Sequence, residues 1–592
     1  MPDNAGDKSA EGSASVLERL NLTGRSWTFY AAASVPPILA AGLVMWYYSS
    51  RPAGPPPKGG KKKRQHQKAR KAKKAAAGEA QKPVADIDEE APEDMTDEQI
   101  AGLDKDTQKK LAQALKSRGN KFFQAKRYEK AIELYTQALR FAEDPVFYSN
   151  RAACHAAAGD REAVIEDCTS ALKLEPRYVK ALMRRAQAYE NINNFREALY
   201  DFTTVCILED FGNNLVAASA ERVLKALAEA EARERVEKRS PRLPSKSFIS
   251  GYLNSFRSCG REAVAAEGEE LSEADALYNE ALKHTVLQEY AQAIDAVEKA
   301  AEAADIAGAG NVQRADELYS LRGMFNFLKS NLDQAVADLD HALDINPAHV
   351  RSYLRKANLF TEKKDLDTVA QLLNEALAAD PSSAETHFQK GQVHFLKQEF
   401  GNAATEYERA AELDADFVYP RIQLGVVQFK LGKMQEAMTT FDDAMKKFPT
   451  RSDLYNYYGE VLAEQGGSDS AIGAFAKAIE LDGTNPLPYV NQAIALFQAN
   501  NEAEKALSLI QNALKVDPEC ELAVAALSQI YLQLGMFEES LTMLRRAVDL
   551  AKSEEEMVSA ITFRETTAAQ YRFIKEHPEL LSKMMGGAMP GA

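Results

Sequence analysis

Residues 384–449, AETHFQKGQVHFLKQEFGNAATEYERAAELDADFVYPRIQLGVVQFKLGKMQEAMTTFDDAMKKFP, contain the pattern that decides the fold. Small and aromatic residues recur in this stretch at a spacing of 34 residues. The matched pairs are Gly391 and Gly425, Ala403 and Ala437, Tyr407 and Phe441, and Ala410 and Ala444. Small residues at facing positions let two antiparallel helices pack closely, so each stretch of 34 residues predicts one helix pair.

The same triplet, a small residue followed four and seven residues later by two more apolar or small residues, recurs along most of the chain. The triplets begin at Ala131, Val164, Ala198, Ala293, Ala335, Val369, Ala403, Ala437, Ala471, Ala506 and Ser540. Their spacings are 33 and 34 and then, after a gap, 42, 34, 34, 34, 34, 35 and 34. Twelve residues before most triplets stands another small residue, which we call position 8 of the repeat. Prolines that end the second helix are Pro176, Pro347, Pro381, Pro449 and Pro518.

This pattern resembles the tetratricopeptide repeat, and about eleven copies are present. The resemblance implies an all-α superhelix with a concave inner face that holds a peptide or another protein. Three repeats cover 107–210 and eight cover 273–552. Residues 211–272 between them are predicted to be a linker that acts as a hinge or a regulatory segment. Residues 553–592 are predicted to form a helix that caps the open end of the second array, followed by a tail.

A transmembrane helix is predicted at 26–50, SWTFYAAASVPPILAAGLVMWYYSS, which has no formal charge. At ~1.5 Å per residue this stretch can cross a hydrocarbon core of about 30 Å. Trp27 and Trp46 stand near its two ends, where interfacial aromatic residues are expected. A cleaved secretory signal is the alternative, but the main basic charge would then precede the apolar stretch.

The flanks of this helix set its orientation. Residues 51–75 carry eleven Lys and Arg and no acid, so this side is expected to stay in the cytosol, while residues 1–25 cross the membrane. The basic flank and an acidic tether together span 51–106. The basic run also fits a nuclear localisation or nucleic-acid patch, but directly behind a membrane span it fits a topogenic, headgroup-facing segment better.

The composition excludes several classes of function. The formal net charge of −15 with one concentrated basic patch argues against a nucleic-acid partner. The five cysteines are odd in number and lack metal-ligand spacing, which indicates a reduced, cytosolic domain. His387 and His394 lie seven residues apart with no third ligand in view, so they are read as structural. No catalytic motif stands apart from the repeats, so we expect no enzymatic activity and no cofactor.

Five polar residues of the first array fall on its concave face. Counted from position 8, Lys116 and Asn120 are at positions 5 and 9 of the first repeat, and Asn150 is at position 6 of the second. Lys180 and Arg184 are at positions 2 and 6 of the third. Residues four apart on a helix share a face. All five side chains carry hydrogen-bond donors, and such a groove favours carboxylates.

The segments KSRGN, YSNR and KALMRR resemble the carboxylate-clamp class of three-repeat domains. That class binds the acidic carboxy-terminal tails of cytosolic heat-shock chaperones. The resemblance implies that Lys116, Asn120, Asn150, Lys180 and Arg184 hold the last aspartate of such a tail and its terminal carboxylate. Phe123, Ala153 and Ala156 lie near these helices and are candidates to seat an apolar residue of the tail.

The order of parts, with phrases such as EDPVFYSN, HFQKGQVHFLKQ and EEEMVSAITF, resembles the fungal branch of the 70-kDa import receptors of the mitochondrial outer-membrane translocase, the TOM complex. This resemblance implies a cytosol-facing receptor with residues 1–25 in the intermembrane space. Its expected partners are chaperone tails, mitochondrial precursor proteins of the carrier type with internal targeting signals, and other translocase subunits. Cargo then passes to the translocation pore.

Alternatives remain open from the sequence. They are a chaperone-docking receptor of the endoplasmic reticulum or plastid membrane, and a membrane-anchored co-chaperone adaptor. The oligomeric state is open as well, a homodimer included. Aromatic residues of the second array lie either in its groove or in its core. These are Phe388, Phe395, Phe429, Tyr458 and Tyr531.

Overall fold

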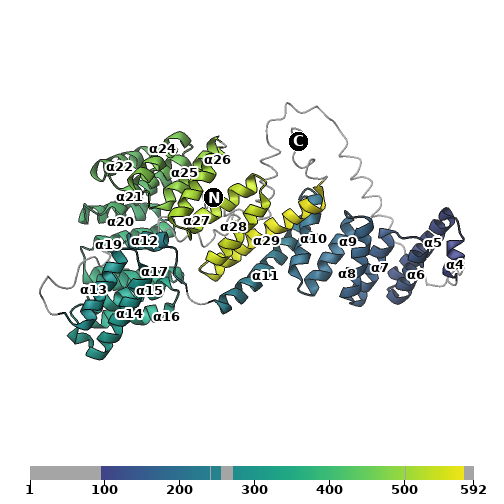
Figure 1. The fold of residues 1–592 in the computed structure, drawn as a ribbon, viewed down its shortest axis with the longest axis horizontal. Helices are drawn as coiled ribbons and strands as arrows, with labels where there is room; N and C mark the ends of the chain where they lie inside the picture. The colour runs from purple at the N-terminus through teal and green to yellow at the C-terminus, as the bar shows by residue number, and fades with distance from the viewer. Residues whose placement is uncertain (1–94, 240–241, 255, 257–270, 501, 579–592) are drawn as a thin grey trace, which may run out of the picture. The chain divides into compact units, whose positions relative to one another are not determined.

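The computed structural model describes residues 95–239, 242–254, 256, 271–500 and 502–578. Within these ranges the chain forms helices and no strand (Figure 1), which confirms the predicted all-α fold. The predicted transmembrane segment at 26–50 lies outside the described residues. Among the helices inside them, none combines the length and the apolar composition that a bilayer span requires.

The chain folds as two compact units. One contains the described residues up to Glu231 together with those from Thr562 onward, and we call it the first unit. The other, Ala232–Ile561, is the second unit. One boundary falls inside helix α11 (Asn214–Lys238) and the other inside helix α29 (Glu554–Glu576).

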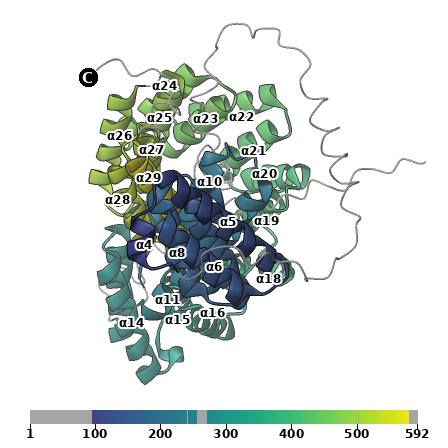
Figure 2. The same cartoon turned by 90° about the vertical axis from the view of Figure 1, so that its right-hand side faces the viewer.

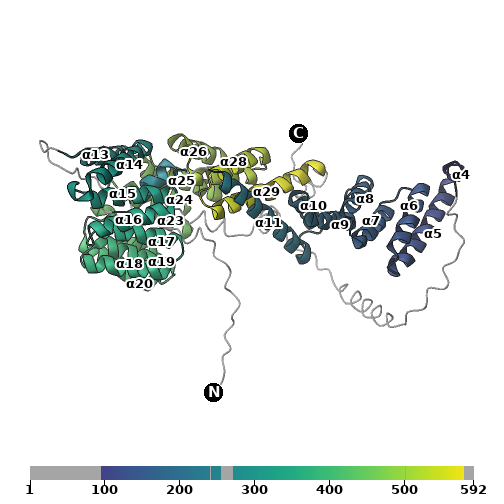
Figure 3. The same ribbon diagram turned by 90° about the horizontal axis from the view of Figure 1, so that it is seen from below.

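Three antiparallel helix pairs form most of the first unit, as the repeat count predicts. Figure 3 shows the pairs α5 with α6, α7 with α8, and α9 with α10 following one another. The helices of this unit ahead of α11 are α4 (Asp97–Ala101), α5 (Lys105–Gln124), α6 (Tyr128–Phe141), α7 (Pro145–Ala158), α8 (Arg161–Leu174), α9 (Val179–Asn191) and α10 (Phe195–Leu208). Aspartates cap several of them: the Asp104 carboxylate accepts hydrogen bonds from two backbone N–H groups of α5, and Asp144 and Asp160 cap α7 and α8.

Eight further pairs form the second unit, from α13 with α14 to α27 with α28. In Figure 2 the colour of this unit runs from teal at α14 through green at α22 to yellow-green at α28. Their bounds are α13 (Glu273–Val286), α14 (Tyr290–Ala307), α15 (Ala315–Leu328), α16 (Leu332–Ile345), α17 (Val350–Glu362), α18 (Leu366–Ala379), α19 (Ala384–Leu396), α20 (Phe400–Leu413), α21 (Val418–Lys430), α22 (Met434–Lys447), α23 (Ser452–Glu464), α24 (Ser468–Leu481), α25 (Pro486–Asn500), α26 (Ala503–Val516), α27 (Glu521–Gln533) and α28 (Phe537–Leu550). The triplets that begin at Ala293 and Ala335 are 42 residues apart because α14 is 18 residues long and is followed by a short helix, η3 (Ala309–Asn311).

Glycine at position 8 lets the two helices of a pair approach closely. A Cβ atom at Gly119 would lie 2.8 Å from the ring of Tyr135, sixteen residues later. A Cβ atom at Gly425 would lie 2.7 Å from the ring of Phe441. These distances are too short for any side chain, so the recurring glycines of the sequence pattern are explained by helix packing.

Part of the segment predicted as a linker belongs to the core of the second unit. Helix α12 (Lys246–Asn254) and Phe256 after it bury Ile249, Tyr252 and Leu253 against the first helix pairs of that unit. The backbone N–H of Ser247 donates to Asp517 Oδ2 at 2.9 Å, near the last pair. The sequence did not indicate this because the segment carries no repeat pattern.

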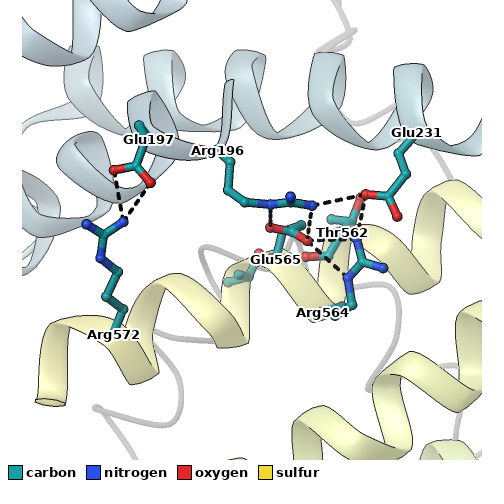
Figure 4. A network of polar contacts seen from close by, with 8 residues as sticks. Arg196, Glu197, Glu231, Thr562, Arg564, Glu565 and Arg572 are labelled. Carbon is teal, nitrogen blue, oxygen red and sulfur yellow. Dashed lines mark hydrogen bonds and ion pairs between the residues drawn. The ribbon is translucent and has the colours of Figure 1, made fainter. Parts of the chain in front are cut away.

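The second half of helix α29 packs on the first unit, whereas the sequence predicts that residues 553–592 cap the second array. Figure 4 shows its polar contacts with α10 and α11. Arg572 Nη1 donates to both oxygens of Glu197 at 2.9 Å, and Arg196 Nε donates to Glu565 Oε2 at 2.9 Å. Phe573 is buried against α10. Helix α29 packs on an apolar face of α10. This face can be recognised only in the folded chain.

Candidate functional site

The candidate site lies on the first helices of the three repeats in the first unit. Helix α5 carries Lys116 and Asn120, α7 carries Asn150, and α9 carries Lys180 and Arg184. The structure supports the repeat numbering, because helices α5, α7 and α9 contact one another in order. Each pair of residues four apart therefore lies on one helix face.

A hydrogen-bond network joins Asn120 and Asn150. The hydroxyl of Tyr135, on α6, donates to Asn120 Oδ1 at 2.7 Å. Asn150 Nδ2 points to the same oxygen at 3.4 Å. Both donors occupy the carbonyl side of the Asn120 carboxamide and leave its NH₂ group for another acceptor.

Arg184 reaches the same region from α9. Its Nη1 donates to the hydroxyl of Ser149, the residue before Asn150. Its charge also acts on Tyr135 and Cys154, since it opposes the effect of burial on both groups. Burial raises the pKa of Cys154 to about 12, so this thiol stays neutral and provides no negative charge for Arg184.

The two lysines lie at the edge of this network. Lys116 is half-buried one turn before Asn120, and Lys180 is exposed one turn before Arg184. Across the described ranges, no Asp or Glu forms an ion pair with Lys116, Lys180 or Arg184. The structure therefore brings Asn120, Asn150 and Arg184 together and leaves the lysines free to contribute charge.

Neighbouring arginines show the opposite arrangement. Arg151 and Arg185 stand at position 7 of their repeats, and each forms a two-pronged pair with an aspartate sixteen residues later. The partners, Asp167 and Asp201, are buried on the second helix of the same repeat. Each of these ion pairs links the two helices of one repeat. In the described part of the chain, no such carboxylate pairs with the nearby Arg184.

The second unit contains the same arginine geometry. Arg355 is at position 6 of α17, as Arg184 is in α9, and its Nη1 donates to Ser320 Oγ at 2.8 Å. Ser320 is at position 5 of the preceding repeat, as Ser149 is. The two sites therefore share a register, and they can be compared directly.

In the second unit a carboxylate of the chain fills this site. Arg351, at position 2, donates to the two oxygens of Glu317 at 3.1 and 2.9 Å. Although burial opposes ionisation, the contact with His349 and the charges of Arg351 and Arg355 hold the pKa of Glu317 well below its usual value. In the first unit, Lys180 and Arg184 occupy positions 2 and 6, and none of its described carboxylates pairs with them.

The three residues predicted to line an apolar pocket are partly exposed on α5 and α7. Phe123 is 37% exposed, and its ring lies 5.7 Å from that of Tyr128. Ala153 and Ala156 are half-buried on α7. Their role in seating an apolar residue stays a prediction.

Two residues of the site were missed from the sequence, Tyr135 and Ser149. In the sequence pattern, Tyr135 is one of the aromatic residues that recur in the repeat. The sequence signal for its role is the hydroxyl group, because other repeats have phenylalanine at the matching position, such as Phe441 and Phe475. Ser149 is fully buried and has no signature of its own in the sequence.

Of the five aromatic candidates of the second array, two belong to its core and three are partly exposed. Phe388 and Phe395 are buried, and Phe429, Tyr458 and Tyr531 are half-buried against core clusters. His387 Nδ1 contacts Glu406 at 2.7 Å and His394 Nδ1 contacts Glu399 at 2.6 Å. The part of the chain that the structure describes holds no group of residues suited to a metal ion.

Comparison with known proteins adds to this geometry. The tetratricopeptide repeat pattern matches residues 329–384, 369–416, 422–486 and 498–562. The chain is 30% identical to mitochondrial import receptor subunit TOM70 of Saccharomyces cerevisiae over 514 residues, which cover 80% of this chain and 82% of that protein. It is 29% identical to the Homo sapiens protein of the same name, over 79% of this chain and 80% of that one. The crystal structure of yeast Tom70 matches with a TM-score of 0.51 at 30% identity, over 82% of this chain and 100% of that chain.

Proposed function

The chain belongs to the TOM70 family of mitochondrial import receptor subunits, and from this premise we propose that it docks cytosolic chaperones and receives their precursor cargo at the mitochondrial outer membrane. In this proposal the first unit binds the acidic carboxy-terminal tail of the chaperone. The second unit binds hydrophobic precursors with internal targeting signals, which then pass to the translocation pore. The proposal involves no catalysis.

One observation carries the chaperone-docking part of the proposal. Lys116, Lys180 and Arg184 lie with Asn120 and Asn150 on the first helices of the three repeats, and no Asp or Glu among the described residues forms an ion pair with the three basic side chains. In the second unit Arg351, which stands at the same repeat position as Lys180, already holds Glu317. A ligand that brings its own carboxylates, such as a free acidic chain end, complements the first unit at the position where the second unit holds a carboxylate of its own.

The proposed topology follows the sequence. Residues 1–25 lie in the intermembrane space, 26–50 cross the membrane, and 51–106 connect the membrane to the first unit in the cytosol. The relatives that match about four fifths of the chain are mitochondrial receptors, which favours this membrane over the endoplasmic reticulum or the plastid envelope.

Replacing Arg184 tests the docking site. We expect Arg184→Ala to lower the affinity for an acidic tail peptide by about tenfold or more, because truncating one side of a desolvated charge pair costs roughly 2–5 kcal/mol. Isothermal titration calorimetry at moderate salt measures the effect.

Arg222→Ala is the matched control. Arg222 is exposed on α11 and pairs with Glu190, so its loss removes the same charge outside the site. We expect this variant to bind like the wild type. Equal affinity for the wild type and Arg184→Ala would reject the docking site.

A further inference from the structure

We propose that Tyr135 is a positioning residue whose hydroxyl fixes the Asn120 carboxamide with its NH₂ group toward the ligand. The inference rests on the proposed docking function and adds a residue that does not touch the ligand itself. It concerns the hydroxyl alone, since the ring has a separate role in packing.

The orientation of Asn120 matters because the two ends of a carboxamide have opposite hydrogen-bonding character. An NH₂ group attracts a carboxylate, whereas the carbonyl oxygen repels it. The hydroxyl of Tyr135 donates to Asn120 Oδ1 at 2.7 Å, and Asn150 Nδ2 faces the same oxygen. A flipped Asn120 would place its NH₂ against that of Asn150. The network therefore selects the orientation that suits an acidic ligand.

The hydroxyl of Tyr135 stays protonated at neutral pH. Burial raises its pKa well above the usual value, and the nearby charge of Arg184 only partly opposes this shift. Tyr135 therefore remains a hydrogen-bond donor under the conditions in which a chaperone tail would bind.

Packing does not require this hydroxyl. Four repeats place an aromatic ring against a glycine at position 8, and the pairs are Gly119 with Tyr135, Gly391 with Tyr407, Gly425 with Phe441, and Gly459 with Phe475. In two of these four repeats the ring belongs to phenylalanine, which has no hydroxyl. The Tyr407 hydroxyl is buried without a hydrogen-bond partner. Among these rings, only Tyr135 uses its hydroxyl, and its partner is a residue of the candidate site.

Tyr135→Phe tests the inference, with Tyr407→Phe as the matched control. The experiment uses the full-length chain in detergent micelles and a ten-residue peptide that ends in acidic residues and a free carboxylate. We expect Tyr135→Phe to weaken peptide binding about three- to tenfold, the range typical of one lost hydrogen bond. Tyr407→Phe keeps the wild-type affinity.

A double-mutant comparison separates positioning from a general structural effect. In an Asn120→Ala background there is no carboxamide to orient, so Tyr135→Phe should cause no further loss. An equal loss in both backgrounds overturns the inference, as does wild-type affinity of the single variant. Failure of the wild-type chain to bind the peptide would instead reject the proposed function.

Discussion

At the scale of single residues, Glu460 is a carboxyl group held inside the second unit. It is 4% exposed, and its Oε1 accepts hydrogen bonds at 2.9 Å from Asn456 Nδ2 and Asn491 Nδ2. Burial raises its pKa to about 8, and the two carboxamides offset this only in part. Glu460 is therefore mostly protonated at neutral pH.

The stability of the second unit should fall as the pH rises toward 8. The folded chain binds the Glu460 proton up to about pH 8, whereas the unfolded chain releases it near 4.5, so the stabilising effect of that proton is lost between these values. Glu460→Gln removes this titration. We expect thermal melting to show a larger gain over the wild type at pH 8.5 than at pH 5.

Glu480→Gln is the control for this pH effect. Glu480 is exposed beside Lys477 on α24, so its replacement should give the same small change at both pH values. If the difference between Glu460→Gln and the wild type does not depend on pH, Glu460 titrates like a surface group and the account of its burial is contradicted.

The residues of the candidate site were predictable where they follow the repeat numbering. Asn120, Asn150 and Arg184 were placed by counting from position 8, and the structure brings them together. Tyr135 and Ser149 were not predictable, because hydrogen bonds between repeats depend on how successive helix pairs stack. In the sequence, the only sign of this stacking is the preference for small residues at the recurring positions.

At the scale of helices, glycine has two roles within one repeat. Gly459 on α23 faces Phe475, and a Cβ atom there would lie 2.7 Å from the ring. Gly473 on α24 is exposed, and a Cβ atom would have no neighbour within 4 Å. The first glycine permits the helix contact, whereas the second only adds flexibility to the unfolded chain and the helix.

Alanine substitutions at these two glycines should have opposite effects. Gly459→Ala forces the Phe475 ring to move and should destabilise the second unit by about 1–3 kcal/mol. Gly473→Ala should stabilise it by about 0.5–1 kcal/mol, because alanine favours a helix over glycine. Urea denaturation monitored by circular dichroism measures both. A change of the same sign for the two variants would contradict the packing role of position 8.

Helix prediction succeeded for the repeats, whereas helix α12 between the two arrays was not predicted. Eleven helix pairs follow from the spacing of small residues. Helix α12 is different: Ile249, Tyr252 and Leu253 are apolar at helical spacing, but nothing local reveals that they fill the core of the second unit. Their partners lie in several repeats, so the contact depends on the curvature of the whole array.

At the scale of the whole molecule, the first unit depends on residues from the far end of the chain. Arg196 and Glu565, which pair within it, are 369 residues apart in sequence. Phe573 is 1% exposed beside Tyr200 and Ile207 of α10. No periodicity could reveal this contact, since α29 lies outside the repeats.

Phe573→Ala should loosen the first unit selectively. Truncating a buried phenylalanine costs about 3–5 kcal/mol. Buried cysteines report on each unit separately, since Cys154, Cys168 and Cys206 lie in the first and Cys520 in the second. We expect alkylation in mild denaturant, mapped by mass spectrometry, to accelerate at the first three.

The rate at Cys520 is the internal control for that experiment and should stay at the wild-type value. A uniform acceleration at all four cysteines would mean that Phe573 stabilises the chain as a whole. Unchanged rates at all four would show that the second half of α29 contributes nothing to the first unit.

One titration tests most directly whether the first unit binds a free carboxylate. The full-length chain is titrated calorimetrically with an acidic chaperone-tail peptide that has a free terminal carboxylate, and with the same peptide amidated at that end. The account predicts that amidation weakens binding by about tenfold or more, because Asn120, Asn150 and Arg184 lose the group they hold. Equal affinity for the two peptides would contradict it.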